Sequence, residues 1–237
     1  MNFLLDGLSE AWRLIVDRDP YLTQLVEVTL KVTFIATTVA VLIGVPIALG
    51  IGLGRFRGRG ALVVLANAGL GLPPVIVGVF MLVLTIRVGP LGWTNLAFTL
   101  RGVYVAQTIL ALPVVIALTI AAVREVAPGL VEQARAFGAR RHKVAALVLW
   151  EARIGVIAAV ITAACASLSE VGAVAIIGGN TEWATQTLAS AALEQVGAGR
   201  YVDAIAIGIL LLLLIVLLTA PLTALQYTGA RRRARQT

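Results

Sequence analysis

The amino-acid sequence predicts an all-α integral membrane protein that crosses a lipid bilayer about five times. Hydrophobic residues make up 59% of the 237 residues and charged residues only 13%, whereas soluble domains contain roughly 45–50% and about 25%. The apolar residues also lie in long runs, and about 20 of them in a row can span the hydrocarbon core of a bilayer. No repeat or linker interrupts the chain, so residues 1–237 are expected to form a single transmembrane domain.

The candidate spans lie within a transmembrane core of residues 25–225. They are Val32–Leu53, Ala61–Ile86, Val103–Val123, Val144–Leu168 and Ala204–Leu225. Pro73-Pro74 interrupts the second span, and because proline lacks an amide proton the helix must break or kink there. Proline also begins a new half-helix well, and a helix N-terminus favours anions. The stretch Gly71–Val77, including Pro73 and Pro74, is therefore predicted to line an anion path, with a packing kink as the alternative.

Basic residues predict the orientation of the chain in the membrane. They gather between spans one and two, in residues 124–143 between spans three and four, and in a basic tail of residues 226–237. These three groups fall on one side, which the positive-inside rule identifies as the cytoplasm. The N-terminus is then outside and the C-terminus inside. The net charge of +7 is explained by this topology, so no nucleic-acid partner is expected.

Residues 1–24 precede the first span and are expected on the extracytoplasmic side. Leu4, Leu8, Trp12 and Ile15 share one helical face, which is typical of a short helix lying in the membrane interface. A frayed terminus is the alternative.

The sequence lacks the residue patterns of enzymes and metal sites. It has no phosphate-binding Gly-Lys-Ser/Thr loop, no HExxH pair and no Cys/His cluster. His142, the single histidine, lies in a cationic stretch and is expected to be a solvated loop residue. We therefore expect no catalytic residue, no metal and no cofactor bound by this chain, and no ATP hydrolysis by it.

Residues 124–143 contain the most informative pattern, which runs from Glu132 to Gly138. It resembles the cytoplasmic signature of the membrane subunits of ATP-binding-cassette (ABC) importers, in which Glu-Ala-Ala is followed three residues later by Gly. Glu132, Ala134 and Gly138 match at that spacing, and Gln133 stands where the family has alanine. The later Leu and Pro of the signature are missing from Val148–Glu151.

The same segment has the chemistry of a docking surface. Small residues such as Ala134 and Gly138 allow another protein to approach the backbone, and Phe137 offers an aromatic anchor of the kind that dominates interface energetics. Arg135 could pair with an acidic group of a partner. The alternative is an amphipathic loop whose arginines only fix the topology.

A second resemblance is to the permeases of tungstate importers. It rests on the stretch from Ser167 to Asn180 and on Gly71–Gly78. Relatives that carry molybdate or sulfate tend to have Gly-Glu-Phe-Gly where this chain has Ser169-Glu170-Val171-Gly172. Ser169, Asn180 and Thr181 can donate hydrogen bonds to an oxyanion. Glu170 is expected instead to accept hydrogen bonds from the backbone or to pair with Arg153 or Arg200.

The resemblance implies a type I ABC importer permease bundle in a bacterial or archaeal cytoplasmic (inner) membrane. It also implies a second copy of the chain, two ATPase subunits that use ATP and Mg, an extracytoplasmic oxyanion-binding protein and surrounding membrane lipid. The transported anion would be tungstate. Alternatives are a permease for molybdate, sulfate or phosphate, and an ion-coupled transporter or channel that works without an ATPase.

Overall fold

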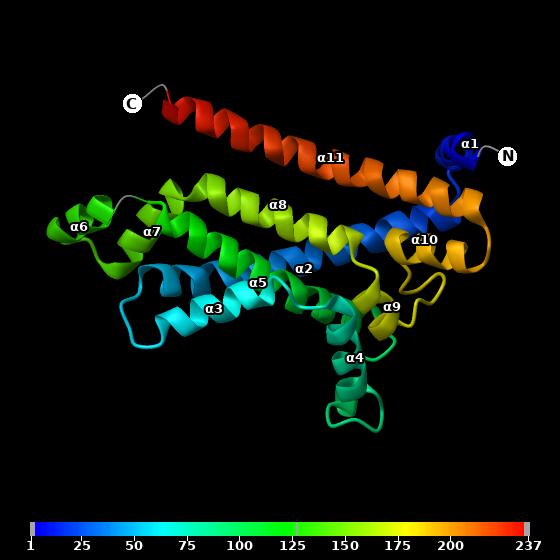
Figure 1. Cartoon of the computed structure of the whole chain (residues 1–237), viewed down its shortest axis with the longest axis horizontal. Coiled ribbons are helices and arrows are strands. Elements are labelled where there is room, and N and C mark those ends of the chain that lie inside the picture. Colours follow the sequence, from blue (N-terminus) through cyan, green and yellow to red (C-terminus); the bar gives the residue numbers. More distant parts are fainter. Residues whose placement is uncertain (1–2, 127, 235–237) are drawn as a thin grey trace.

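The computed structural model of the chain describes residues 3–126 and 128–234, and within these ranges its regular secondary structure is helical (Figure 1). The helices are α1 Phe3–Val16, α2 Pro20–Leu53, α3 Arg59–Gly69, α4 Pro74–Thr85, the 3₁₀ turn η1 Gly92–Thr94, α5 Leu100–Arg124, α6 Pro128–Ala136, α7 Arg141–Glu151, α8 Arg153–Ser169, α9 Gly172–Gly178, α10 Leu188–Gly197 and α11 Tyr201–Ala234.

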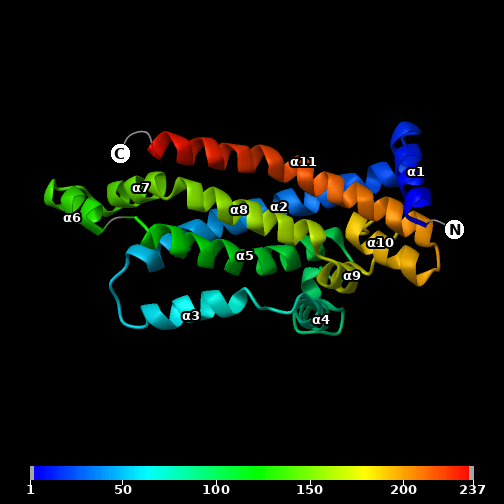
Figure 2. The ribbon, with the colours of Figure 1, turned by 45° about the horizontal axis from the view of Figure 1, so that its top comes forward.

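The long helices form an elongated bundle. In Figures 1 and 2, α2, α5, α8 and α11 run along its length. By length and composition, 3 helices (α2, α5 and α11) can each cross a membrane alone, and the number rises to 5 if two bent pairs, α3 with α4 and α7 with α8, each count as one span. The prediction of an α-helical membrane protein with about five spans is confirmed in these terms.

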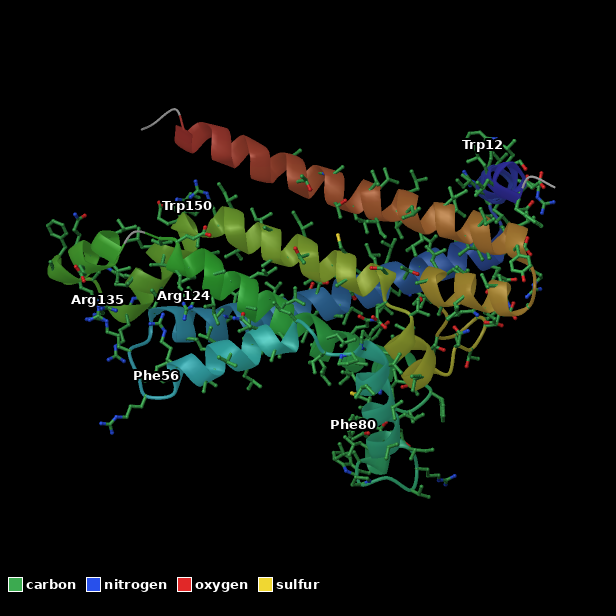
Figure 3. All side chains as sticks on the ribbon, viewed as in Figure 1. Trp12, Phe56, Phe80, Arg124, Arg135 and Trp150 are labelled. Carbon is green, nitrogen blue, oxygen red and sulfur yellow. The ribbon has the colours of Figure 1, made fainter. Side chains whose placement is uncertain are left out.

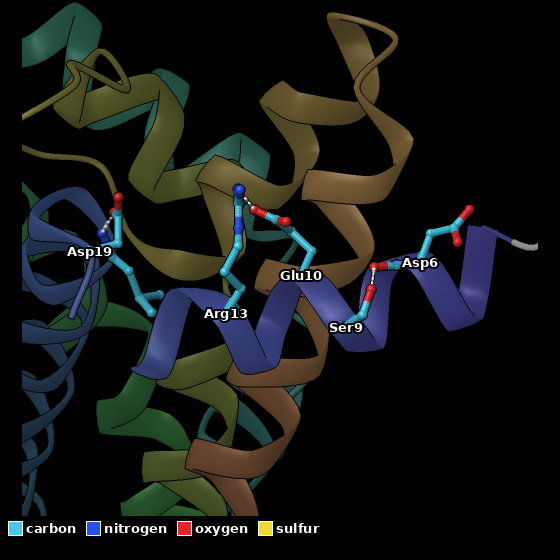
Figure 4. A network of polar contacts seen from close by, with 6 residues as sticks. Asp6, Ser9, Glu10, Arg13 and Asp19 are labelled. Atoms are coloured by element: carbon cyan, nitrogen blue, oxygen red, sulfur yellow. Dashed lines mark hydrogen bonds and ion pairs between the residues drawn. The ribbon is translucent and has the colours of Figure 1, made fainter. Parts of the chain in front are cut away.

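Helix α2 begins earlier than the predicted span Val32–Leu53. Its N-terminus is fixed by Asp19, whose side chain accepts a hydrogen bond from the Leu22 N–H at 2.8 Å (Figure 4), and by Pro20 at the first helical position. A side-chain cap and an N1 proline are both favourable at a helix start. The 34-residue helix is therefore longer than the hydrocarbon core requires and extends beyond the predicted span at its N-terminal end.

The predicted interruption of the second span is confirmed as a full break. Helices α3 and α4 meet at 99°. Pro73 is the N-cap of α4 and Pro74 is its first residue. Figure 1 shows α4 projecting sideways from the bundle.

The fourth span differs from the continuous segment predicted for Val144–Leu168. Helix α7 ends at Glu151, and α8 begins at Arg153 after a bend of 71°. The Arg153 guanidinium donates to the Trp150 carbonyl at 2.6 Å and lies 4.6 Å from the centre of the Trp150 ring. Arg153 thus bonds a carbonyl in the last turn of α7, which favours ending the helix there.

The helix that contains the predicted fifth span Ala204–Leu225 extends beyond it at both ends, while the stretch that qualifies as a membrane span is Tyr201–Pro221. Helix α11 continues to Ala234, so residues 226–234 of the predicted basic tail are helical. The rest of that tail, residues 235–237, lies outside the described residues.

Helix α1 confirms that the N-terminal segment is helical and not frayed. It lies across α11 at one end of the bundle (Figure 2). Gly7 and Ala11 are buried, and a Cβ added to Gly7 would lie 2.4 Å from the Ile205 side chain of α11. Leu4 and Trp12 point away from the bundle and are exposed, as expected for a helix that presents an apolar face to lipid.

The basic groups predicted to share one side of the membrane lie at one end of the bundle. Figure 1 shows the loop between α2 and α3, the pair α6–α7 and the C-terminal end of α11 together at the left. We call this the basic end. Helices α1, α9 and α10 lie at the other end, which we call the N-terminal end.

Helix α4 is held to the bundle by close packing against α9. Gly78 of α4 faces Ala173, and a Cβ at Gly78 would lie 2.9 Å from the Ala173 Cα. Such an approach is possible only because glycine has no side chain, as at many helix contacts in membranes.

Substitution of Gly78 by alanine is expected to destabilise the fold by about 1–3 kcal/mol, because the new methyl group meets backbone that cannot turn aside. The matched control is Gly208→Ala in α11, where no atom lies within 4 Å of the added Cβ. Thermal unfolding of the purified protein in detergent measures both. Equal midpoints for the two variants would show that the α4–α9 contact does not limit stability.

Candidate functional site

The predicted docking segment, residues 132–138, begins in the short helix α6 and includes the turn that ends this helix. The N–H groups of Gly138 and Ala139 donate to the carbonyls of Arg135 and Ala134 at 2.9 and 3.0 Å, which is a Schellman cap. Gly138 has φ +78°, a conformation that costs other residues roughly 1–2 kcal/mol. The glycine of the signature therefore stops α6 and turns the chain toward α7.

The side chains of the segment divide into an inward and an outward set. Ala134 is half-buried and, with Val131, packs against a hydrophobic cluster that includes Val144 and Val148 of α7. Phe137 is 90% exposed at the end of the segment, and Arg135 is also exposed (Figure 3). Ala134 thus attaches α6 to the bundle, while Phe137 and Arg135 are available to a partner.

Glu132 lies near the loop that follows α2. Its carboxylate is 4.0 Å from the Arg55 guanidinium, and both side chains are largely exposed. An exposed ion pair of this kind contributes at most about 1 kcal/mol, so Glu132 remains free to exchange Arg55 for another partner.

A pocket lies beside the break in the second span. It has a volume of about 120 Å³ and is walled by the α3–α4 turn, α5 and α8. We call it the broken-span pocket, and its lining residues are Gly69, Leu70, Leu72, Pro74, Gln107, Leu110, Ala111, Val114, Ala163, Ala166, Ser167 and Glu170. Its polar side chains are few: Gln107 comes from α5, Ser167 from the last turn of α8 and Glu170 from the C-cap of α8.

Gln107 is the polar residue of this pocket whose side chain has an unsatisfied hydrogen-bond donor. Its side chain is 1% exposed. The Ser167 hydroxyl donates to the Gln107 carbonyl oxygen at 3.1 Å, and the Gln107 Nε2 atom has no hydrogen-bond acceptor among the described residues. A buried donor without an acceptor costs about 1–3 kcal/mol, and a bound anion would remove that cost.

Glu170 accepts a hydrogen bond from the backbone, which is one of the two roles predicted for it. Its Oε1 atom accepts a hydrogen bond from the Ala173 N–H at 3.1 Å, at the first turn of α9. In the described part of the chain no arginine lies within ion-pair distance of it. A Cβ at Gly172 would lie 3.5 Å both from this oxygen and from the Val75 nitrogen. The carboxylate therefore lies close to the N-terminus of α4.

The other predicted path residues lie elsewhere. Ser169 ends α8, and its hydroxyl donates to the Cys165 carbonyl at 2.7 Å. Asn180 donates to the Glu194 carboxylate at 2.7 Å. The Thr181 N–H donates to the Thr185 hydroxyl at 3.0 Å. Neither Asn180 nor Thr181 lines the broken-span pocket, because both belong to the loop between α9 and α10.

Of the predicted path residues, Pro74 lies at the pocket, and Pro73 immediately precedes it. Gln107 and Ser167, which the sequence prediction missed, complete the polar wall. The signal for Gln107 was its amide, the single one in the otherwise apolar and hydroxyl-bearing run Val103–Val123. No sequence pattern indicated that Ser167 would face it.

Comparison with known proteins gives matches over most of the chain. Residues 40–234 match the family described as binding-protein-dependent transport system inner membrane component. A Haloferax volcanii protein named "Probable anion ABC transporter permease protein" is 36% identical over 200 residues, covering 82% of this chain and 86% of the relative.

Two further relatives have names that specify the cargo. A tungstate uptake system permease protein of Peptoclostridium acidaminophilum is 27% identical over 226 residues, covering 95% of this chain and 99% of the relative. A molybdenum transport system permease protein of Azotobacter vinelandii is 30% identical over 198 residues, covering 76% and 83% of the two chains.

These matches extend across α5, the docking segment, α8 and most of α11, so they include the signature and the helices that wall the broken-span pocket. With its apolar helices long enough to cross a bilayer, the chain belongs to the family of inner-membrane permease components of binding-protein-dependent transport systems.

Proposed function

We propose that this chain is the permease subunit of an ATP-driven oxyanion importer, with tungstate as the first candidate cargo. The observation that carries the proposal is the docking segment, a capped helix with an exposed aromatic residue at its tip. The cargo class is supported by relatives named for anion, tungstate and molybdenum transport.

The proposed assembly has two copies of this chain, two ATPase subunits and an extracytoplasmic binding protein. The basic end would lie in the cytoplasm, in accordance with the positive-inside rule, and would present α6 to the ATPase. The N-terminal end would receive the anion from the binding protein. ATP and Mg would be bound by the ATPase subunits.

Packing provides a route from the docking segment to the broken-span pocket. Val131 and Ala134 of α6 pack against a hydrophobic cluster that includes Val123 of α5 and Val148 of α7, and α7 leads directly into α8. Helices α5 and α8 then carry Gln107 and Ser167 to the pocket. Movement of α6 with an ATPase subunit would shift both walls of the pocket, which is a rigid-body form of coupling.

The broken-span pocket is proposed as a passing point for the anion. The unpaired Gln107 N–H donor and the N-terminus of α4 favour an anion there. The Glu170 carboxylate, which also lines the pocket, opposes it. Weak net binding suits a conduit, since an ion must be able to leave as well as enter.

Reconstitution of the chain in proteoliposomes tests this function. With the ATPase subunit and the binding protein present, we expect radiolabelled tungstate uptake that requires ATP and is competed by molybdate more than by sulfate. Uptake driven by an ion gradient without the ATPase would contradict the proposal and indicate a transporter that acts alone. ATP-dependent uptake of sulfate in preference to tungstate would retain the permease assignment and change the cargo.

A further inference from the structure

A large cavity lies at the basic end, away from the broken-span pocket. Its volume is about 980 Å³, and it is bounded by the last turns of α2, the loop after it, and α6–α7. Its lining divides into two parts. One is an apolar wall that includes Pro46, Leu49 and Leu53, and the other is a cationic rim made by Arg55, Arg135 and Arg141, beside His142.

The rim has an excess of positive charge. No acidic side chain in the described part of the chain lines the cavity. Among the described residues, Arg135 and Arg141 form no ion pair within 4.0 Å, and Arg55 has only its distant contact with Glu132 at that limit. Three guanidinium groups around one cavity repel one another, and an anion placed between them would relieve that repulsion.

The apolar wall distinguishes between kinds of anion. Pro46–Leu53 is the end of a helix long and apolar enough to cross a membrane, so we infer that this wall lies at the depth of the acyl chains and the rim at the depth of the head groups. A small inorganic anion would use the rim and leave the wall uncovered. An amphipathic anion uses both parts.

We propose that this cavity binds an anionic phospholipid, with its head-group phosphate at Arg55, Arg135 and Arg141 and its acyl chains along the Pro46–Leu53 wall. Basic pockets between membrane helices on the cytoplasmic side are suited to such head groups. Because Arg135 belongs to the docking segment and Arg55 follows α2, the bound lipid would connect the docking segment to α2. Figure 3 shows Arg135 and Phe56, another lining residue, at the same end.

Lipid binding by the purified full-length chain tests the inference without any ATPase, binding protein or transport, so its outcome is independent of the proposed function. Native mass spectrometry would compare phosphatidylglycerol with phosphatidylcholine of identical acyl chains. We expect phosphatidylglycerol to be retained preferentially. The combined variant Arg55→Ala, Arg135→Ala and Arg141→Ala should weaken its binding roughly 10–100-fold.

Two controls separate this site from general attraction to basic residues. The combined variant Arg124→Ala and Arg140→Ala removes charge at the same end from residues that do not line the cavity, and it should retain the lipid. Gly50→Leu should block the acyl chains while keeping the rim, because no atom lies within 4 Å of a Cβ at Gly50, which also lines the cavity. Circular dichroism would verify that each variant remains helical.

The inference would be overturned by equal binding of the two lipids, or by unchanged phosphatidylglycerol binding in the rim variant. It would also be overturned if inorganic phosphate or tungstate at millimolar concentration displaced the lipid and Gly50→Leu had no effect, because the site would then be one for free anions.

Discussion

Replacement of Phe137 by alanine is expected to weaken binding of the ATPase subunit by about 10–100-fold and to abolish most ATP-driven uptake. The ring is 90% exposed, so its removal costs the isolated chain little. At an interface, truncation of a buried aromatic anchor commonly costs about 2 kcal/mol or more, and about 1.4 kcal/mol corresponds to a tenfold change in affinity. Pull-down of the ATPase subunit with detergent-solubilised protein measures the effect directly.

Trp93→Ala is the matched control for Phe137→Ala. Trp93 is 78% exposed in η1 and belongs to the segment that follows α4, away from the docking segment (Figure 1). Its replacement should leave ATPase binding intact. Equal binding by the Phe137 variant and the wild type would contradict the docking assignment, whatever the level of uptake.

Gly138 allows a finer distinction within the same experiment. Alanine there opposes the left-handed conformation, whereas asparagine tolerates it and adds a larger side chain. No atom lies within 4 Å of a Cβ at this position in the chain itself. If both Gly138→Ala and Gly138→Asn lose ATPase binding, the partner must approach this position closely. If only Gly138→Ala loses binding, ATPase binding requires the left-handed turn and tolerates a side chain.

The features that could be predicted from sequence are those decided by local chemistry. The break at Pro73-Pro74 follows from the missing amide protons. The apolar runs predicted the number of spans because any membrane span must be long and apolar. In these cases a few neighbouring residues are sufficient to predict the local structure.

Features that depend on distant residues could not be predicted. The bend at Ala152 lies where Arg153 reaches back to the Trp150 carbonyl and ring, which a hydropathy pattern does not reveal. The contact between Gln107 and Ser167 joins residues 60 positions apart. The hydrogen bonds of Asn180 to Glu194 of α10 and of Thr181 to Thr185 in the same loop likewise depend on how the chain folds back.

Replacement of Gln107 by leucine is expected to lower uptake at least about tenfold while retaining ATPase binding. The substitution removes the buried N–H donor proposed to meet the anion, and it preserves much of the side-chain volume. The unfolding midpoint should change little, because relief from the unpaired Nε2 donor, about 1–3 kcal/mol, is offset by loss of the hydrogen bond that the Ser167 hydroxyl donates to the Gln107 oxygen. Uptake in proteoliposomes and the unfolding midpoint in detergent are measured on the same preparation.

Gln24→Leu is the control, since the Gln24 Oε1 atom is likewise buried and without a partner among the described residues, yet Gln24 does not line the broken-span pocket. If both variants are at least as stable as the wild type and only the Gln107 variant loses uptake, the lost function is specific to the pocket and not a consequence of misfolding. Undiminished uptake by Gln107→Leu would instead show that the anion crosses elsewhere. The test compares stability with uptake on the same variant, because a glutamine with a purely structural role would lose stability and uptake together.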